Sequence, residues 1–452
     1  MHIQIKKGLN IPLKGMPQGK LQLLPLPSTV SLDLSPFDHL RFTLLKKIGD
    51  QVRAGEPIVQ AKDTHKLIFV SPGSGVVKEI VRGLKRRLLR VIIAVNPDEQ
   101  PWLCEPLEID SAPPDQVMQL LLQGGIFPHI QVRPSFRLPD VEKLPEAVFI
   151  RALASAPFAP SPELEVLGKE KEFACGLKVL QLLCPDQVHL VFHASSSCEA
   201  FIQAQDIVKH TALGPHPIES SSIHIEAIYP IFNRDQVIWT LNVSTVIGIG
   251  NLLINGASYT DQVISIAGEG VSEEKRGFFR LCRGYPAREL VHSHCSDPKK
   301  ARLISGDPLM GEQIDEDGYI GFFHSVFCAI PEIEEKREML HFLRPCRRFY
   351  TATATYLPKW WKKNYSFTTH RRGEERAFVD PTIYNRVMPL LIPIVPLIKA
   401  LLAEDYVAAE ELGLLEVAPE DFALPTFVCP SKVEMVAIIE RGIKAYRAQY
   451  YL

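Results

Sequence analysis

The chain has 452 residues, of which 46% are hydrophobic and 23% are charged, and its formal net charge at pH 7 is -2. This composition is typical of a folded globular protein, and it excludes a largely disordered chain and a dedicated nucleic-acid-binding surface. The length is too great for a single core and indicates about three or four domains. The 36 prolines favour loops and rigid turns over long helices.

The cysteines are scattered along the chain, and none of them belongs to a C-x-x-C pair: Cys104, Cys175, Cys184, Cys198, Cys282, Cys295, Cys328, Cys346 and Cys429. An odd, unpatterned set in a long chain indicates reduced thiols and an intracellular location. The first 20 residues contain four lysines and lack the apolar run of a signal peptide, so we expect no export.

The first module, residues 1–100, consists of short β-rich runs separated by glycine turns. This pattern predicts a small β-sandwich, similar to the barrel-sandwich hybrid fold of biotinyl and lipoyl carriers. Those carriers modify a lysine at the tip of a hairpin, in an M-K-M or D-K-A setting. The corresponding segment here, residues 61–66, lacks that frame. A modified Lys62 or Lys66 therefore stands only as an alternative.

Helical and strand patterns alternate through the second module, residues 101–258. Apolar spacing predicts helices at 115–122 and 176–183, and buried strands at 147–153 and 187–192. Such alternation favours a Rossmann-like α/β domain with a largely parallel sheet.

Gly248 and Gly250 follow a strand-like run at 239–247, which suggests a phosphate-binding loop. A dinucleotide fingerprint needs a third glycine three residues after the second, and Leu253 occupies that position. We therefore interpret residues 244–256 as a helix start at a domain junction, where the glycines serve backbone geometry.

Short strand patterns at 263–267, 278–283 and 302–305 predict a small α+β module over residues 259–330. The same stretch holds a C-x9-H-x-H-C set, Cys282, His292, His294 and Cys295. Four such ligands are compatible with zinc, but their spacing matches no common zinc module. We expect no metal, and zinc remains an alternative.

The last region, residues 331–452, is predicted to be mostly helical after two strand patterns at 319–330 and 339–344. Apolar spacing places helices at 381–388, 394–404, 407–412 and 432–449. Residues 387–403 are very apolar, but they are short for a membrane span and contain three prolines and a lysine. We interpret them as a buried or partner-facing element.

Residues 359–376 combine cationic and aromatic side chains, including Trp360 and Trp361. Such a mixture can bind polyanions, but a solvated loop or subunit contact is favoured because no other part of the chain reinforces a polyanion site. His216 lies between two prolines and could act as a general base, although a structural turn is the simpler interpretation. Cys429 resembles the last cysteine of an iron–sulfur motif whose companions are missing.

Residues 124–136 form the most distinctive candidate site. A glycine turn between helix and strand of an α/β layer often approaches a ligand. A quinone head group needs a flat apolar slot and one or two hydrogen-bond donors, and Phe127, His129, Arg133 and Phe136 can supply them. The alternative is a proline-rich surface loop.

Eight segments, taken in order, resemble the family of A subunits of sodium-translocating NADH:quinone reductases. They lie near residues 6–15 and at 71–77, 124–136, 213–217, 259–268, 303–309, 384–390 and 426–432. The family is similar to the NADH-binding subunit of complex I and to the C subunit of the Rnf complex. The flavin and NADH loop of those relatives is reduced here to residues 124–128, and their cluster cysteines to Cys429.

The resemblance implies a peripheral subunit on the cytoplasmic side of a membrane complex that oxidises NADH, reduces ubiquinone and exports sodium. Flavins, iron–sulfur centres and the NADH site belong to other subunits, so we expect no catalytic residue or cofactor in this chain. The expected role is quinone interaction or assembly on a membrane-embedded partner, through residues 359–376 and 387–403. The resemblance also implies that residues 259–330 are a β-grasp, SLBB-like domain. The alternatives are a lipoyl- or biotinyl-type carrier and a stand-alone nucleotide-binding oxidoreductase.

Overall fold

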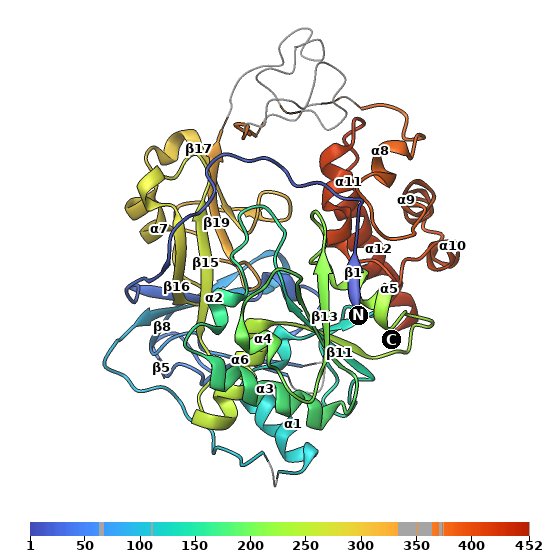
Figure 1. Ribbon diagram of the computed structural model, residues 1–452. Helices are drawn as coiled ribbons and strands as arrows, with labels where there is room; N and C mark the ends of the chain where they lie inside the picture. Colours follow the sequence, from blue (N-terminus) through green and yellow to red (C-terminus); the bar gives the residue numbers. More distant parts are fainter. Residues whose placement is uncertain are drawn as a thin grey trace.

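The computed structural model describes residues 1–62, 67–109, 112–332, 350, 364–369, 373 and 375–451. Its N-terminal β part consists of two packed sheets (Figure 1). One has the order β3 (Thr29–Asp33), β9 (Leu88–Val95), β8 (Gly75–Arg82) and β5 (Gln51–Val52). The other has the order β4 (Phe42–Leu44), β6 (Pro57–Ala61) and β7 (Ile68–Val70). The expected β-sandwich is confirmed.

The second part is a doubly wound α/β layer, as expected. Its sheet has the order β1 (His2–Gln4), β13 (Val208–Leu213), β12 (Val188–His193), β11 (Ala147–Ala152), β14 (Ile238–Asn242) and β10 (Gln131–Arg133). Only β10 is antiparallel to its neighbour. The helices are α1 (Pro114–Gln123), α2 (Glu163–Val166), α3 (Glu170–Leu183), α4 (Glu199–Ile202), α5 (Ser221–Ile228) and α6 (Val243–Asn255).

The third part is a mixed sheet with one helix, α7 (Ala287–His294). Its strand order is β18 (Glu312–Gln313), β17 (Ala301–Ser305), β19 (Val326–Pro331), β15 (Asp261–Ala267), β16 (Gly277–Cys282) and β2 (Leu21–Leu23). The first residues of the chain add β1 to the edge of the second sheet and β2 to the edge of the third sheet (Figure 1). The chain then enters the N-terminal β part, called the barrel below. The predicted strand at 319–330 is shorter than expected, because β19 begins only at Val326.

The C-terminal region is helical, as predicted, with α8 (Thr382–Asn385), α9 (Ile394–Leu402), α10 (Tyr406–Glu411), α11 (Ala423–Val428) and α12 (Met435–Tyr450). Most apolar side chains of residues 387–403 are buried in the core of this region, while Leu391 and Leu402 are exposed. No helix in the described ranges is long and apolar enough to cross a bilayer. The predicted strand at 339–344 lies outside the described residues, and so does half of the basic stretch 359–376.

Helix α6 occupies the stretch that resembles a phosphate loop. The strand prediction for 239–247 is too long, because β14 ends at Asn242, whose side-chain oxygen accepts a hydrogen bond from the Thr245 amide at 2.9 Å. This is a helix N-cap, and it starts α6 before the two glycines are reached. Gly248 and Gly250 therefore lie inside a buried helix rather than in a strand-to-helix turn.

Gly250 allows α6 to pack against α3 at backbone distance. A Cβ atom at Gly250 would lie 1.8 Å from the carbonyl oxygen of Glu172. The facing glycine, Gly176 on α3, is equally tight, since its Cβ would lie 2.1 Å from the carbonyl oxygen of Val246. Backbone atoms cannot move aside as a flexible side chain can, so this crossing requires glycine on both helices.

The two glycines of α6 should therefore respond oppositely to alanine. Gly250→Ala should lower the free energy of unfolding by about 3 kcal/mol, because it forces the two helices apart. Gly248→Ala is the matched control: its Cβ would meet Ile126 at 3.4 Å and Tyr259 at 3.6 Å. Helix propensity should then leave stability unchanged or raise it by up to about 1 kcal/mol. Urea unfolding followed by circular dichroism checks both, and equal effects would contradict the packing role.

Candidate functional site

A cavity of about 40 Å³ lies where the barrel, the α/β layer and the third sheet meet. Its walls combine aromatic rings with polar side chains, and they come from all three parts: Ser31, Asp33, Phe69, Ser71, Pro128, His129, Tyr259, Arg283 and Phe322 are among the lining residues. One hydrophobic core is continuous through the same three parts and includes Phe69, Trp239 and Phe327. The cavity is therefore a mainly apolar gap within a shared apolar core, with a few polar side chains in its wall.

His129 ends the short 3-10 turn Phe127–His129, which follows α1. Its ring stacks on Phe322, with 4.5 Å between centroids and 15° between planes. No hydrogen bond joins its ring nitrogens to another described residue. Burial, reinforced by the charge of Arg283, holds the pKa of His129 well below its ordinary value. The imidazole is thus neutral at neutral pH, and it can donate one hydrogen bond and accept another.

Arg283 reaches the cavity from just beyond β16, and its Nη2 donates to Ser244 Oγ at 2.5 Å. Its Nε has no hydrogen-bond partner among the described residues although it is buried, and the same holds for the hydroxyls of Ser31 and Tyr259. Burial lowers the pKa of Arg283 and raises that of Tyr259, so burial disfavours the charged form of each. Unpaired buried donors are costly, and three beside one cavity are the pattern of a ligand or water site.

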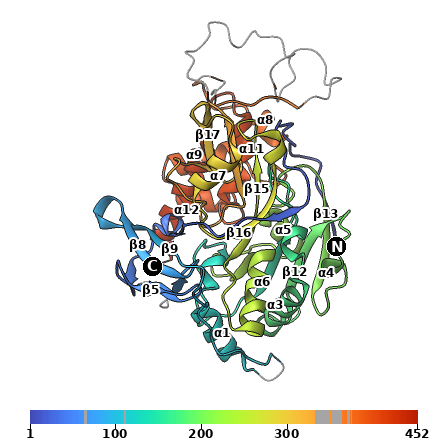
Figure 2. The same cartoon turned by 90° about the vertical axis from the view of Figure 1, so that its left-hand side faces the viewer.

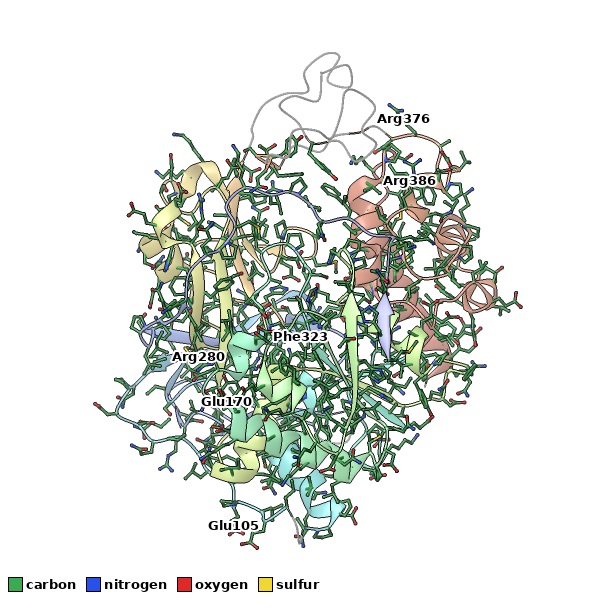
Figure 3. All side chains as sticks on the ribbon, in the orientation of Figure 1. Glu105, Glu170, Arg280, Phe323, Arg376 and Arg386 are labelled. Atoms are coloured by element: carbon green, nitrogen blue, oxygen red, sulfur yellow. The ribbon has the colours of Figure 1, made fainter. Side chains whose placement is uncertain are left out.

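Glu165 in α2 lies close to Tyr259 and Arg283. Its Oε1 accepts a hydrogen bond from the Val263 amide at 2.8 Å, while its Oε2 is buried without a partner in the described residues. Burial raises the pKa of this carboxyl to about 7, against the opposing effect of Arg283 and Arg280. Arg280 (Figure 3) also ties β16 to α2, because its Nη2 donates to the carbonyl of Glu165 at 3.2 Å.

These side chains fill the crevice where doubly wound sheets usually bind ligands. β11 pairs in parallel with both β12 and β14, so the chain connects in opposite directions on its two sides. Ligands commonly bind at the carboxyl ends of the strands at such a point. Here the hydrogen bond from Arg283 to Ser244, in the first turn of α6, links the third sheet to the carboxyl end of β14. A contact between domains therefore occupies the position of a nucleotide loop, in agreement with the interpretation of residues 244–256 as a helix start at a domain junction.

The structure does not bring the four predicted quinone residues together. Phe127 is fully buried and packs edge-on against Trp239, with 6.0 Å between centroids. Arg133 is buried on another side, where its Nη1 donates to Ser222 Oγ at 2.9 Å and its Nη2 to the Glu416 carbonyl at 2.8 Å. The guanidinium also lies 4.5 Å from the ring centroid of Phe136. Of the four, only His129 lines the cavity.

The zinc alternative gains no support from the geometry. His294 Nδ1 donates to the Leu290 carbonyl at 3.1 Å, whereas the exposed His292 faces Glu316 at 3.3 Å. Within the described ranges, no three His, Cys, Asp or Glu side chains are arranged to hold a metal ion.

The remaining candidates from the sequence are His216, Cys429 and the two carrier-type lysines. His216 Nδ1 lies 3.1 Å from Ser155 Oγ, at the end of the parallel sheet. The buried Cys429 thiol lies 3.2 Å from the Tyr384 hydroxyl, inside the C-terminal core. Lys62 is exposed just beyond β6, and Lys66 lies outside the described residues.

Glu165 should make stability depend on pH. The unfolded carboxyl titrates near 4.5 and the folded one at about 7, so the folded state binds an additional proton between these values. Stability is then lost as pH rises through that window. Glu165→Gln should be more stable than the natural chain near pH 8, by up to about 3 kcal/mol, and the difference should shrink towards pH 4.5.

Thermal unfolding midpoints across this pH range provide the measurement. Glu170→Gln is the matched control, since Glu170 is exposed on the neighbouring helix α3 (Figure 3). Parallel pH profiles for Glu165→Gln and the natural chain would contradict the assignment.

Comparison with known proteins supports the resemblance found in the sequence. Residues 3–96 match the family described as the NqrA N-terminal barrel-sandwich hybrid domain, and residues 112–258 match the NqrA second alpha/beta domain. A solved NAD+-reducing [NiFe]-hydrogenase aligns over 76% of this chain and 70% of its own, with 10% identity and a TM-score of 0.38.

Curated relatives match along the whole chain. The A subunit of the Na(+)-translocating NADH-quinone reductase of Chlamydia pneumoniae is 35% identical, over 99% of this chain and 97% of its own length. The protein of the same name from Photorhabdus laumondii is 34% identical, over 96% of each chain. On this similarity, the chain belongs to the family of Na(+)-translocating NADH-quinone reductase A subunits.

Proposed function

We propose that this chain is a peripheral subunit of a membrane complex that couples NADH oxidation and ubiquinone reduction to sodium export. Its full-length similarity to proteins named as A subunits of the Na(+)-translocating NADH-quinone reductase supports the complex. Within that complex the chain contacts quinone and helps assembly, without a redox cofactor of its own. The single observation that carries the quinone role is the inter-domain cavity, where aromatic walls meet unpaired hydrogen-bond donors.

The chemistry of the cavity suits a quinone head group. A quinone ring is flat and apolar, and its carbonyl oxygens only accept hydrogen bonds. The rings of Phe69 and Phe322 supply apolar walls, while Tyr259 and Arg283 carry donors without partners among the described residues. A neutral His129 adds a donor beside Phe322 without adding charge. A ligand that accepts hydrogen bonds from such buried donors removes the free energy cost of leaving them unpaired.

The cavity must widen before a quinone ring can enter. Its volume of about 40 Å³ holds roughly one water molecule, whereas ligand pockets measure roughly 300–1,000 Å³. The walls belong to three parts of the chain, so a small displacement of one part opens the gap without unfolding any of them. We propose that quinone binds such an opened state, with Phe322 and Tyr259 moving away from His129 together with the third sheet.

We propose that flavins, iron–sulfur centres and NADH bind to other subunits. The strand-to-helix turn after β14 contains no glycine, and Arg283 bonds to Ser244 at the place where a phosphate would approach. The Cys429 thiol packs beside Tyr384 in an apolar core. Flavin absorbance or stoichiometric iron in the purified chain would contradict this proposal.

The proposed location is the cytoplasmic side of the membrane. All eight described cysteines are free thiols, which is typical of a reducing compartment. For the contact with a membrane-embedded partner we propose the exposed leucines of the C-terminal region. Leu391 is 85% exposed and Leu402 58% exposed, although the surrounding segment is otherwise mostly internal. Val407, at the start of α10, is a third exposed apolar side chain of this region, at 62%.

Substitution at His129 tests the quinone role. His129→Ala should raise the KM for quinone of the assembled complex about tenfold, because it removes a donor and a stacked ring. The chain should stay in the complex, and His129→Asn, which retains an N–H donor, should restore part of the affinity.

Arg133→Ala is the comparison, since Arg133 joins β10 to the C-terminal region and does not line the cavity. It should leave the KM unchanged and lower the free energy of unfolding by about 3 kcal/mol. An unchanged KM in His129→Ala, with the chain retained in the complex, would move the quinone site elsewhere.

The docking surface is tested separately. Leu391→Ser combined with Leu402→Ser should reduce copurification of membrane subunits while the isolated chain keeps its thermal stability, since both side chains already face solvent. Leu167→Ser is the control, because Leu167 is 57% exposed in the loop before α3. Undiminished copurification of the double variant would exclude this surface.

A further inference from the structure

The β8–β9 hairpin extends from the barrel at the edge of the molecule (Figure 2). Residues 75–95 contain six cations and one acid, whereas the whole chain has a net charge of -2. The positive charge is concentrated at the tip, where residues 82–87 include Arg82, Lys85, Arg86 and Arg87 and no acid. This density of charge is therefore a local feature of the hairpin.

The tip presents an apolar side chain among these cations. Leu84 is 93% exposed, the largest exposure among the large hydrophobic residues of the described chain. Lys85 and Arg86 are also exposed, and no ion pair joins them to another described residue. Arg82 Nη1 donates to the Arg86 carbonyl at 3.0 Å, which fixes the backbone of the tip while its charge is retained.

The β9 side of the hairpin is held against the barrel, beginning with Arg87 at the end of the tip. Arg87 Nη2 donates to the Ser35 carbonyl at 2.8 Å, and Arg87 Nη1 lies 3.9 Å from Asp38. Arg90 Nε lies 3.8 Å from Asp33. Asp38 and Asp33 of the barrel therefore face Arg87 and Arg90. The uncompensated charge of the tip is carried by Arg82, Lys85 and Arg86.

We propose that this tip binds the surface of a bilayer that contains anionic phospholipids. Cations near an anionic leaflet are attracted by its surface potential, and an exposed leucine gains free energy at the boundary between headgroups and acyl chains. A protein partner is less suited, because a stable protein interface buries about 800 Å² on each side and a two-stranded tip offers far less. The hairpin thus provides a lipid contact in addition to the contact with membrane subunits.

Flotation of the full chain with vesicles tests the proposal, using phosphatidylcholine alone or mixed with phosphatidylglycerol. Binding should occur only to the anionic vesicles and weaken as salt is raised. Each cation contributes roughly fivefold to the partition constant, so Lys85→Gln with Arg86→Gln should lower it about 25-fold. Leu84→Ser should lower it about tenfold.

The matched controls are Lys171→Gln with Lys178→Gln, which remove the same charge from the exposed face of α3, and Leu167→Ser. They should bind like the natural chain. Failure of the natural chain to float with anionic vesicles, or equal losses in the hairpin and control variants, would overturn the lipid assignment. If the hairpin variants lost membrane subunits on purification while vesicle binding stayed normal, the tip would be a protein contact instead. None of these outcomes depends on the quinone cavity.

Discussion

Helix α6 is buried along almost its whole length, and its contact with α3 sets the positions of the elements around the candidate site. Gly176 and Gly250 allow the two backbones to touch, and a side chain on either would collide with a carbonyl group. At its start, α6 receives the hydrogen bond from Arg283, and at its end Asn251 Nδ2 donates to the Ala257 carbonyl at 2.6 Å. The first link leads to the end of β16 in the third sheet, and the second leads to the segment that connects α6 to β15. A close helix crossing in the α/β layer therefore determines where the third sheet lies.

The position of the third sheet explains why the Rossmann-like layer contacts another domain at the crevice where such layers usually bind a ligand. Arg283, at the end of β16, reaches the start of α6 just beyond β14, Tyr259 lines the same cavity, and Glu165 in α2 is bound to Val263 of the third sheet. The burial of these groups costs solvation free energy that their few hydrogen bonds only partly offset. The unsatisfied donors remain at one small gap, which is where a ligand with carbonyl acceptors would be bound most favourably.

The fold class follows from the sequence because apolar spacing and glycine turns are local signals. The helix α1 and the strands β11 and β12 appear close to their predicted ranges. The strand prediction for 239–247 is wrong in its second half, since Val246 and Ile247 suit a strand as well as a buried helix. The N-cap at Asn242 was the signal that separates the two.

The site was less predictable, because its residues are distant in sequence. His129 was identified from its local motif, but Ser31, Tyr259 and Arg283 stand alone in the sequence and converge only through packing of three parts. Arg133, four residues from His129, was grouped with it by proximity in sequence, yet it faces the C-terminal region. Sequence spacing gives neighbours along an element, whereas a site between domains depends on how the elements pack.

Purification from native membranes tests most directly whether this chain is a subunit of a sodium-translocating NADH:quinone reductase. A tagged chain should bring down membrane-embedded subunits together with flavin- and iron-containing partners, and the preparation should reduce quinone with NADH in a sodium-stimulated reaction. Recovery of the chain alone, or with partners that lack NADH-dependent quinone reduction, would contradict the account.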